Sequence, residues 1–67
     1  MKKKYFSGRK VFVARMYKGL NSKHLANLSG VTESHLIAIE QERESPSVHT
    51  IIALAKALDV NVEVLFE

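Results

Sequence analysis

The sequence contains no cysteine, no tryptophan, one proline and three glycines. Without cysteine the chain can form neither disulfides nor thiolate metal sites, so helix packing or self-association has to stabilise it. No apolar run reaches the roughly 18 residues that a membrane span needs, and no signal-peptide core follows Met1–Lys4. We therefore expect a protein of the reducing cytoplasm, with no membrane partner and no cofactor.

Acidic residues are absent from residues 1–32, which hold eight lysines and arginines, whereas residues 33–67 hold two of these cations and seven acids. The overall net charge of +3 therefore divides into +8 and −5. A basic segment suggests a polyanionic partner, most often a nucleic acid. For Lys2, Lys3 and Lys4 a solubilising tail is the alternative, and charge alone does not decide between the two.

A chain of 67 residues has room for one small core, and a domain of this size buries only about 60% of its unfolded surface. Neither an internal repeat nor a low-complexity linker interrupts it. We expect a basic N-terminal arm at residues 1–8 and one continuous domain at residues 9–67.

The spacing of apolar residues predicts four helices and a short fifth, and no segment alternates for long enough to form a strand. Each of the first four helices begins after a residue with a capping side chain, namely Ser7, Asn21, Thr32 and Ser47. Gly19 and Gly30 end the first two helices and Asp59 ends the fourth. Asn61 to Phe66 form the fifth. The predicted fold class is all-α.

Only Gly30, Val31 and Thr32 separate the second helix from the third. A connection this short cannot return the chain antiparallel, so the two helices should cross steeply. Ala26 is small enough to let the second helix approach the third. This pattern predicts a helix-turn-helix.

The chain from about Arg9 to Phe66 resembles the Cro and phage-repressor (Xre-type) helix-turn-helix family. The resemblance lies in LA at 25–26, GV at 30–31, IE at 39–40, PS at 46–47, and the LAKAL pattern at 54–58 followed by LF at 65–66. It implies a compact four- to five-helix, repressor-like DNA-binding domain. The implied function is a transcriptional regulator, a repressor, that binds operator DNA as a homodimer and is associated with the nucleoid.

The resemblance also implies which residues touch DNA, because the third helix of this family enters the major groove. The base contacts expected by position are Thr32, Glu33, Ser34, Ile37 and Ala38. The phosphate contacts expected are Ser22, Lys23, Lys10, Arg43 and His35. Arg15 and Glu40 stand where the family often has an ion pair between the first and third helices. The alternative is two independent solvated charges.

The expected base-contacting surface carries none of the strongest base-contacting side chains, since residues 33–38 include no Arg, Lys, Asn or Gln. Glu33 can accept a hydrogen bond from cytosine N4, and Ile37 or Ala38 can touch a thymine methyl group. Glu42 and Glu44 follow and would repel phosphates. A second hypothesis therefore stays open, in which the chain is an antitoxin-like or regulatory protein-binding module that keeps the fold.

The remaining candidate residues indicate neither a metal site nor an enzyme. His24, His35 and His49 fall on three different predicted helices without the spacing of metal ligands. No cysteine, glycine-rich phosphate loop or HExxH motif is present, so no catalytic residue is predicted. Phe12 either extends the core or belongs to a partner surface. Val62, Val64 and Phe66 are the candidates for a dimer interface.

Overall fold

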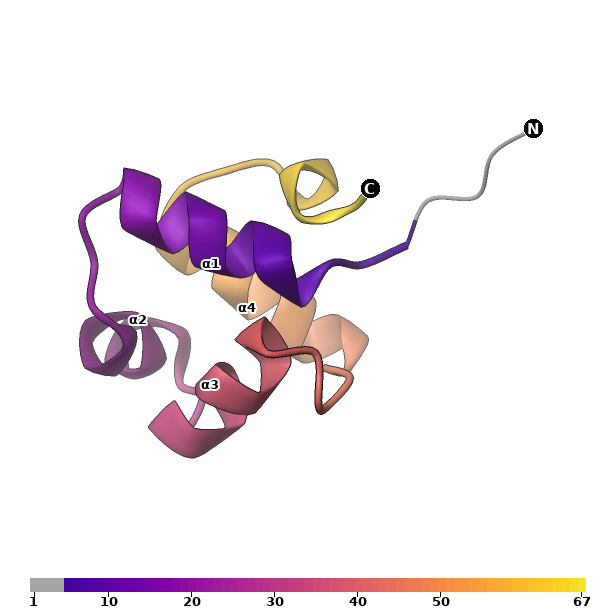
Figure 1. Ribbon diagram of the computed structural model, residues 1–67. Helices are drawn as coiled ribbons and strands as arrows, with labels where there is room; N and C mark the ends of the chain where they lie inside the picture. The colour runs from indigo at the N-terminus through magenta and orange to yellow at the C-terminus, as the bar shows by residue number, and fades with distance from the viewer. Residues whose placement is uncertain (1–4) are drawn as a thin grey trace.

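The computed structural model describes residues 5–67, which form four α-helices and one 3-10 helix (Figure 1). They are α1 (Gly8–Tyr17), α2 (Ser22–Ser29), α3 (Glu33–Glu40), α4 (Val48–Leu58) and η1 (Val62–Leu65). The predicted all-α class is confirmed, although the fifth helix is a 3-10 helix and shorter than expected. None of the helices in residues 5–67 combines the length and apolar character needed to cross a membrane.

The N-terminal caps are the four that the sequence predicts. The side chains of these caps accept hydrogen bonds from the backbone N–H groups three residues later: Ser7 from Lys10, Asn21 from His24, Thr32 from His35 and Ser47 from Thr50. Such bonds satisfy N–H groups that have no partner within the helix. Gly30 and Asp59 take the left-handed conformation that ends α2 and α4.

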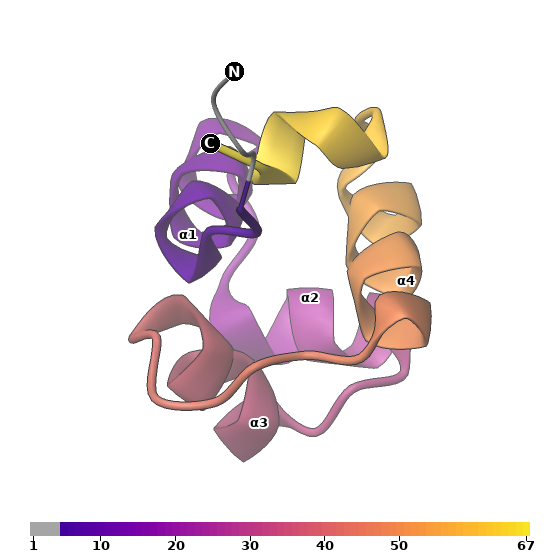
Figure 2. The same ribbon diagram turned by 90° about the vertical axis from the view of Figure 1, so that its right-hand side faces the viewer.

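The helices enclose one core. In Figure 2, α1 and α4 form two sides of the domain, η1 closes the top, and α2 and α3 close the bottom. Every helix contributes a fully buried apolar side chain to the centre, among them Val11, Leu25, Leu36, Leu54, Leu58 and Leu65. Because each 8-residue helix is too short to be stable alone, this shared core holds α2 and α3 in place.

The N-terminal segment is joined to the C-terminal one. Ser7 donates its backbone N–H to the Leu65 carbonyl (2.8 Å), and Phe6 and Phe66 form an antiparallel bridge with their rings edge to face, 5.9 Å apart. Tyr5 to Gly8 therefore belong to the folded domain, so the predicted arm of residues 1–8 is too long at its C-terminal end. Lys2, Lys3 and Lys4 lie outside the described residues.

Gly8, which was predicted to belong to that arm, is the point where α1 and α3 meet. A β-carbon built on Gly8 would lie 1.8 Å from the backbone carbonyl oxygen of Ile39 in α3. Backbone atoms cannot give way as a flexible side chain can. Only glycine therefore allows α1 to start this close to the end of α3.

Replacing Gly8 with alanine should push α1 away from α3 and lower the free energy of unfolding by about 3 kcal/mol. Gly19→Ala is the matched control, because a β-carbon there meets nothing within 4 Å and is penalised only by the backbone angle φ of +73°. That penalty is about 1 kcal/mol. Urea unfolding monitored by circular dichroism measures both losses, and equal losses would contradict the close contact.

Candidate nucleic-acid interface

The turn between α2 and α3 is fixed by backbone hydrogen bonds. Gly30 and Val31 both donate their N–H groups to the carbonyl of Ala26, the latter at 3.1 Å, while Gly30 is left-handed with φ of +74°. Val31 packs partly buried against the core, and Thr32 then caps α3. Figure 1 shows the result, with α2 seen nearly end-on and α3 running at a steep angle to it. The predicted helix-turn-helix is present.

The first residues of α2 and α3 are tied together by their side chains. The Ser22 hydroxyl donates a hydrogen bond of 2.7 Å to Oε2 of Glu33, across 11 residues of sequence. Within residues 5–67, Oε1 of Glu33 has no hydrogen-bond partner, so it can accept one from a ligand. Both residues were candidates from the sequence. Their bond was not predicted, because nothing in their spacing indicates that the side chains meet.

Most of the expected base-contacting residues lie on this surface. Thr32, Glu33 and Ser34 are exposed at the start of α3, and Ile37 is half-buried one turn later. Ala38 is the exception, and the expectation that it contacts a base is corrected. Its side chain is only 2% exposed because this side of α3 turns inward between Leu36 and Ile39.

The expected phosphate contacts divide between two sides of the molecule. Lys23 is exposed beside Ser22 in the first turn of α2, and Arg43 is exposed in the loop after α3, where its Nε donates to Gln41. His35 is bonded to a carboxylate instead, with Nδ1 lying 2.5 Å from Oε1 of Glu44. Lys10 lines a groove on the other side of α1. Lys10 therefore lies away from the start of α3, and its contact with phosphate stays a prediction.

The predicted ion pair between Arg15 and Glu40 joins α1 to α3. Nε of Arg15 donates to Oε2 of Glu40 (2.8 Å) and Nη2 donates to Oε1 (3.0 Å), with side chains only 11% and 7% exposed. Nη1 donates to the carbonyl of Leu20, in the connection to α2 (3.0 Å). One guanidinium group thus links α1 both to α3 and to the connection between α1 and α2. The hydrogen bond to Glu40 raises the pKa of Arg15 above its ordinary value.

Phe12 neither enters the core nor stands free. It is 44% exposed, and its ring lies under the Arg15 guanidinium, whose central carbon is 5.3 Å from the ring centroid. A cation over an aromatic face is attracted by the ring's quadrupole. Phe12 therefore covers one face of the cation that holds α1 to α3.

The three candidates for a dimer interface differ in their surroundings. Val62 and Val64 on η1 are each 44% exposed. Phe66 is half-buried and packs against Phe6 within the chain, and its contact in a dimer stays a prediction. In residues 5–67, no three His, Cys, Asp or Glu side chains cluster closely enough to hold a metal ion, and His24 and His49 are exposed.

Known helix-turn-helix sequences are similar to this chain over most of its length. A helix-turn-helix family model matches residues 14–65. The chain is 36% identical over 62 residues to an uncharacterized HTH-type transcriptional regulator of Rickettsia conorii, covering 92% of this chain and 50% of that protein. It is 32% identical over 59 residues to the HTH-type transcriptional regulator PuuR of Escherichia coli, covering 88% and 32%. The chain thus spans half the length, or less, of these curated relatives.

Solved structures are similar over most of their length. The restriction-modification controller protein C.AhdI of Aeromonas hydrophila superposes with a TM-score of 0.86 and 36% identity, covering 88% of this chain and 89% of that one. SinR, described as the master regulator for biofilm formation and solved in complex with DNA, gives 0.82 and 32%, covering 87% and 94%. These relatives are regulators and not enzymes, in agreement with the absence of predicted catalytic residues.

Arg15→Ala and Glu40→Ala should each lower the free energy of unfolding by about 3 kcal/mol, because each leaves a nearly buried charge without its partner. The double variant should lose about as much as either single variant, since the interaction is already gone. Urea unfolding of the four proteins gives the coupling free energy. Losses that simply add would show that the two side chains act independently.

Proposed function

We propose that this chain, which belongs to the helix-turn-helix family of DNA-binding transcriptional regulators, binds operator DNA as a homodimer and represses transcription through α3. The proposal rests above all on one observation, the Ser22–Glu33 bond that presents the exposed starts of α2 and α3 as one surface. Such a surface suits the major groove, where the N-terminal residues of a recognition helix contact base edges.

The base contacts that we propose are few and weak. Oε1 of Glu33 would accept a hydrogen bond from cytosine N4, and the hydroxyl groups of Thr32 and Ser34 would bond to neighbouring base edges or phosphates. Ile37, half-buried, would touch a thymine methyl group. Ser22 already donates its single hydroxyl proton to Glu33, so a hydrogen bond from this hydroxyl to a phosphate would replace that bond.

Affinity would come from cations around this surface. Lys23 and Arg43 are exposed near α2 and α3. Lys2, Lys3 and Lys4, which lie outside the described residues, would supply further positive charge. His35 uses Nδ1 for its bond to Glu44, so a phosphate contact would be made by its other ring nitrogen, Nε2. Because contacts between these cations and phosphates release counterions, we expect binding that weakens as salt is added. Glu33, Glu42 and Glu44 repel phosphates and would lower the affinity.

The homodimer is proposed to form through η1, with the half-exposed Val62 at its centre and Val64 at its edge. A twofold pair of α3 helices would then contact half-sites one helical turn, about 34 Å, apart. Val62→Glu should weaken the dimer by placing a charge in this contact. Sedimentation equilibrium measures the dissociation constant of the dimer. A variant that dimerises as tightly as the unmodified chain would place the interface elsewhere.

A second candidate function is a protein-binding module that keeps the fold. The acidic residues Glu33, Glu42 and Glu44 around α3 favour it, because they suit a basic protein better than a phosphate backbone. SinR, 32% identical to this chain, has also been solved in a complex with the protein SinI. Direct measurement of DNA binding separates the two candidates.

Fluorescence anisotropy with labelled random-sequence duplexes should show saturable binding at about 50 mM salt that weakens steeply at about 200 mM. The reason is that released counterions drive the contact with phosphates. Adding an unlabelled duplex as competitor is the control for surface adsorption. No binding at the lower salt concentration would reject the DNA-binding proposal and favour the protein-binding module.

Glu33→Gln should raise the affinity for DNA about tenfold and change the preferred base at one position from cytosine to adenine. The substitution removes a charge that repels phosphates, and an amide can both donate to and accept from adenine. A selection of bound sequences from a random DNA pool, followed by anisotropy, measures both effects.

Glu67→Gln is the matched control, since it neutralises an exposed glutamate outside α3 and η1 and should leave base preference unchanged. If Glu33→Gln altered neither the affinity nor the preferred base, α3 would not face the major groove. The similarity to DNA-bound relatives would then be one of fold alone.

A further inference from the structure

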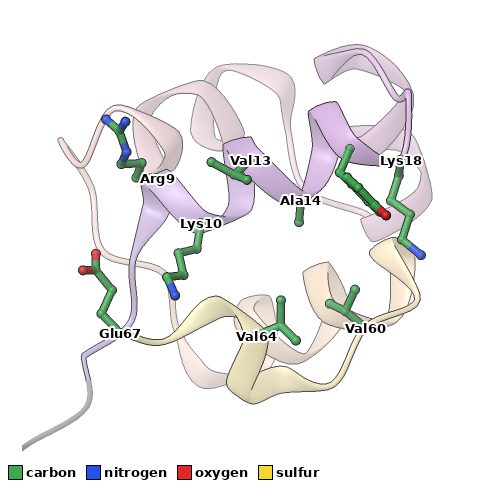
Figure 3. A pocket seen from close by; sticks show the side chains of 9 residues that line it. Arg9, Lys10, Val13, Ala14, Lys18, Val60, Val64 and Glu67 are labelled. Atoms are coloured by element: carbon green, nitrogen blue, oxygen red, sulfur yellow. The ribbon is translucent and has the colours of Figure 1, made fainter.

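A second surface feature is a groove between α1 and the C-terminal segment (Figure 3). It has a volume of about 580 Å³. Val13 and Ala14 of α1 face Val60 and Val64 across it, so its walls are apolar. Its volume is that of a ligand-binding cleft, and it is open along its length rather than enclosed.

The groove lies on the side of α1 opposite to α3. Successive residues of a helix turn by about 100°, so Lys10 and Tyr17, which line the groove, project away from Gly8 and Arg15, which contact α3. Figure 1 agrees, since η1 lies on one side of α1 and α3 on the other. The groove therefore stays accessible while the start of α3 contacts another molecule.

The charges on the rim argue against a second copy of the chain as the occupant. Among residues 5–67, the rim carries Arg9, Lys10 and Lys18 and only one acidic residue, Glu67, so two copies joined groove to groove would bring like charges together. The occupant should then be a different molecule. That the occupant joins a regulator bound to DNA rests on the proposed DNA-binding function.

The charges around the groove indicate the chemistry of that molecule. Arg9 and Lys10 stand at one end and Lys18 at the other, and within residues 5–67 none of the three is in an ion pair with a carboxylate. Glu67 is the one acidic residue on the rim, at the Arg9 end, so the rim keeps a net positive charge. An occupant with carboxylates at both ends would complement it.

The side chains between these cations are suited to packing against a partner. Tyr17 is 88% exposed and Val13 is 54% exposed, although both lie on a helix that belongs to the core. Tyrosine is enriched at the centres of protein interfaces, because it buries a large area with little loss of conformational freedom. Lys10 and Lys18 are about 12 Å apart along the helix axis, a little more than two helical turns.

We propose that the α1–η1 groove binds an acidic amphipathic helix of another protein. The apolar stripe of that helix would lie between Val13 and Val64, as in other helix-in-groove complexes. Two of its carboxylates, seven or eight residues apart, would match the distance between Lys10 and Lys18. Such a contact would add a protein partner to a regulator already bound to DNA.

The test uses the full chain, labelled with ¹⁵N, and a synthetic helical peptide of about four turns with a leucine stripe flanked by glutamates. Titration should move the amide resonances of Val13, Val60 and Val64 to saturation and leave those of Glu33 and Ser34 in place. The same peptide with lysine in place of every glutamate should not bind. No saturation by about 1 mM glutamate peptide, or equal binding of the lysine peptide, would overturn the proposal.

Val13→Glu should weaken binding of the glutamate peptide at least about tenfold by placing a like charge in the groove. Val48→Glu is the matched control, because Val48 is 69% exposed at the start of α4 and does not line the groove. It should leave peptide binding unchanged. Equal effects of the two variants would overturn the proposal.

Two further measurements on Val13→Glu separate this proposal from the proposed function. DNA binding by Val13→Glu should equal that of the unmodified chain, so a failure of DNA binding in both proteins would count against the proposed function alone. Sedimentation equilibrium should show the same oligomeric state for both. If Val13→Glu alone were monomeric, the groove would be a self-interface and the proposal would be wrong.

Discussion

The contact between α1 and α3 is the constraint on which the other features depend. Gly8 lets the two backbones touch, and the Arg15–Glu40 pair fixes the direction in which they do so. An isolated helix of 8 residues has too few hydrogen bonds to be stable, so α3 exists only as part of this arrangement. Its second half is held against α1, and its first turn, with Glu33, projects free of the core (Figure 1).

The same contact divides the surface of α1 between two neighbours. One side faces α3 and the other lines the groove with η1, so the basic residues between positions 5 and 32 do not form one patch. Lys23 lies beside the helix-turn-helix, whereas Arg9, Lys10 and Lys18 surround the groove. The charge asymmetry along the sequence indicated a single polyanionic partner. In the folded chain, however, the basic residues lie on two separate surfaces.

Local features of the fold could be predicted because their causes lie within a few residues. A capping side chain bonds to an N–H group three residues away, and a left-handed turn needs only glycine or a tolerant residue such as Asp59. The short Gly30–Thr32 connection likewise determined the steep crossing of α2 and α3. The Arg15–Glu40 pair spans 25 residues, and only resemblance to a known family identified it in advance.

The sequence by itself therefore determined the four α-helices with their N-terminal caps, the helix-turn-helix and most of its exposed face. The tertiary structure alone decided the close contact at Gly8, the pairing of Phe6 with Phe66, the burial of Ala38, the bond between Ser22 and Glu33, and the groove along α1. Each of these depends on the rotation and separation of helices distant in sequence. A turn of one residue, about 100°, moves a side chain from solvent to core, and apolar spacing does not fix helix rotation that finely.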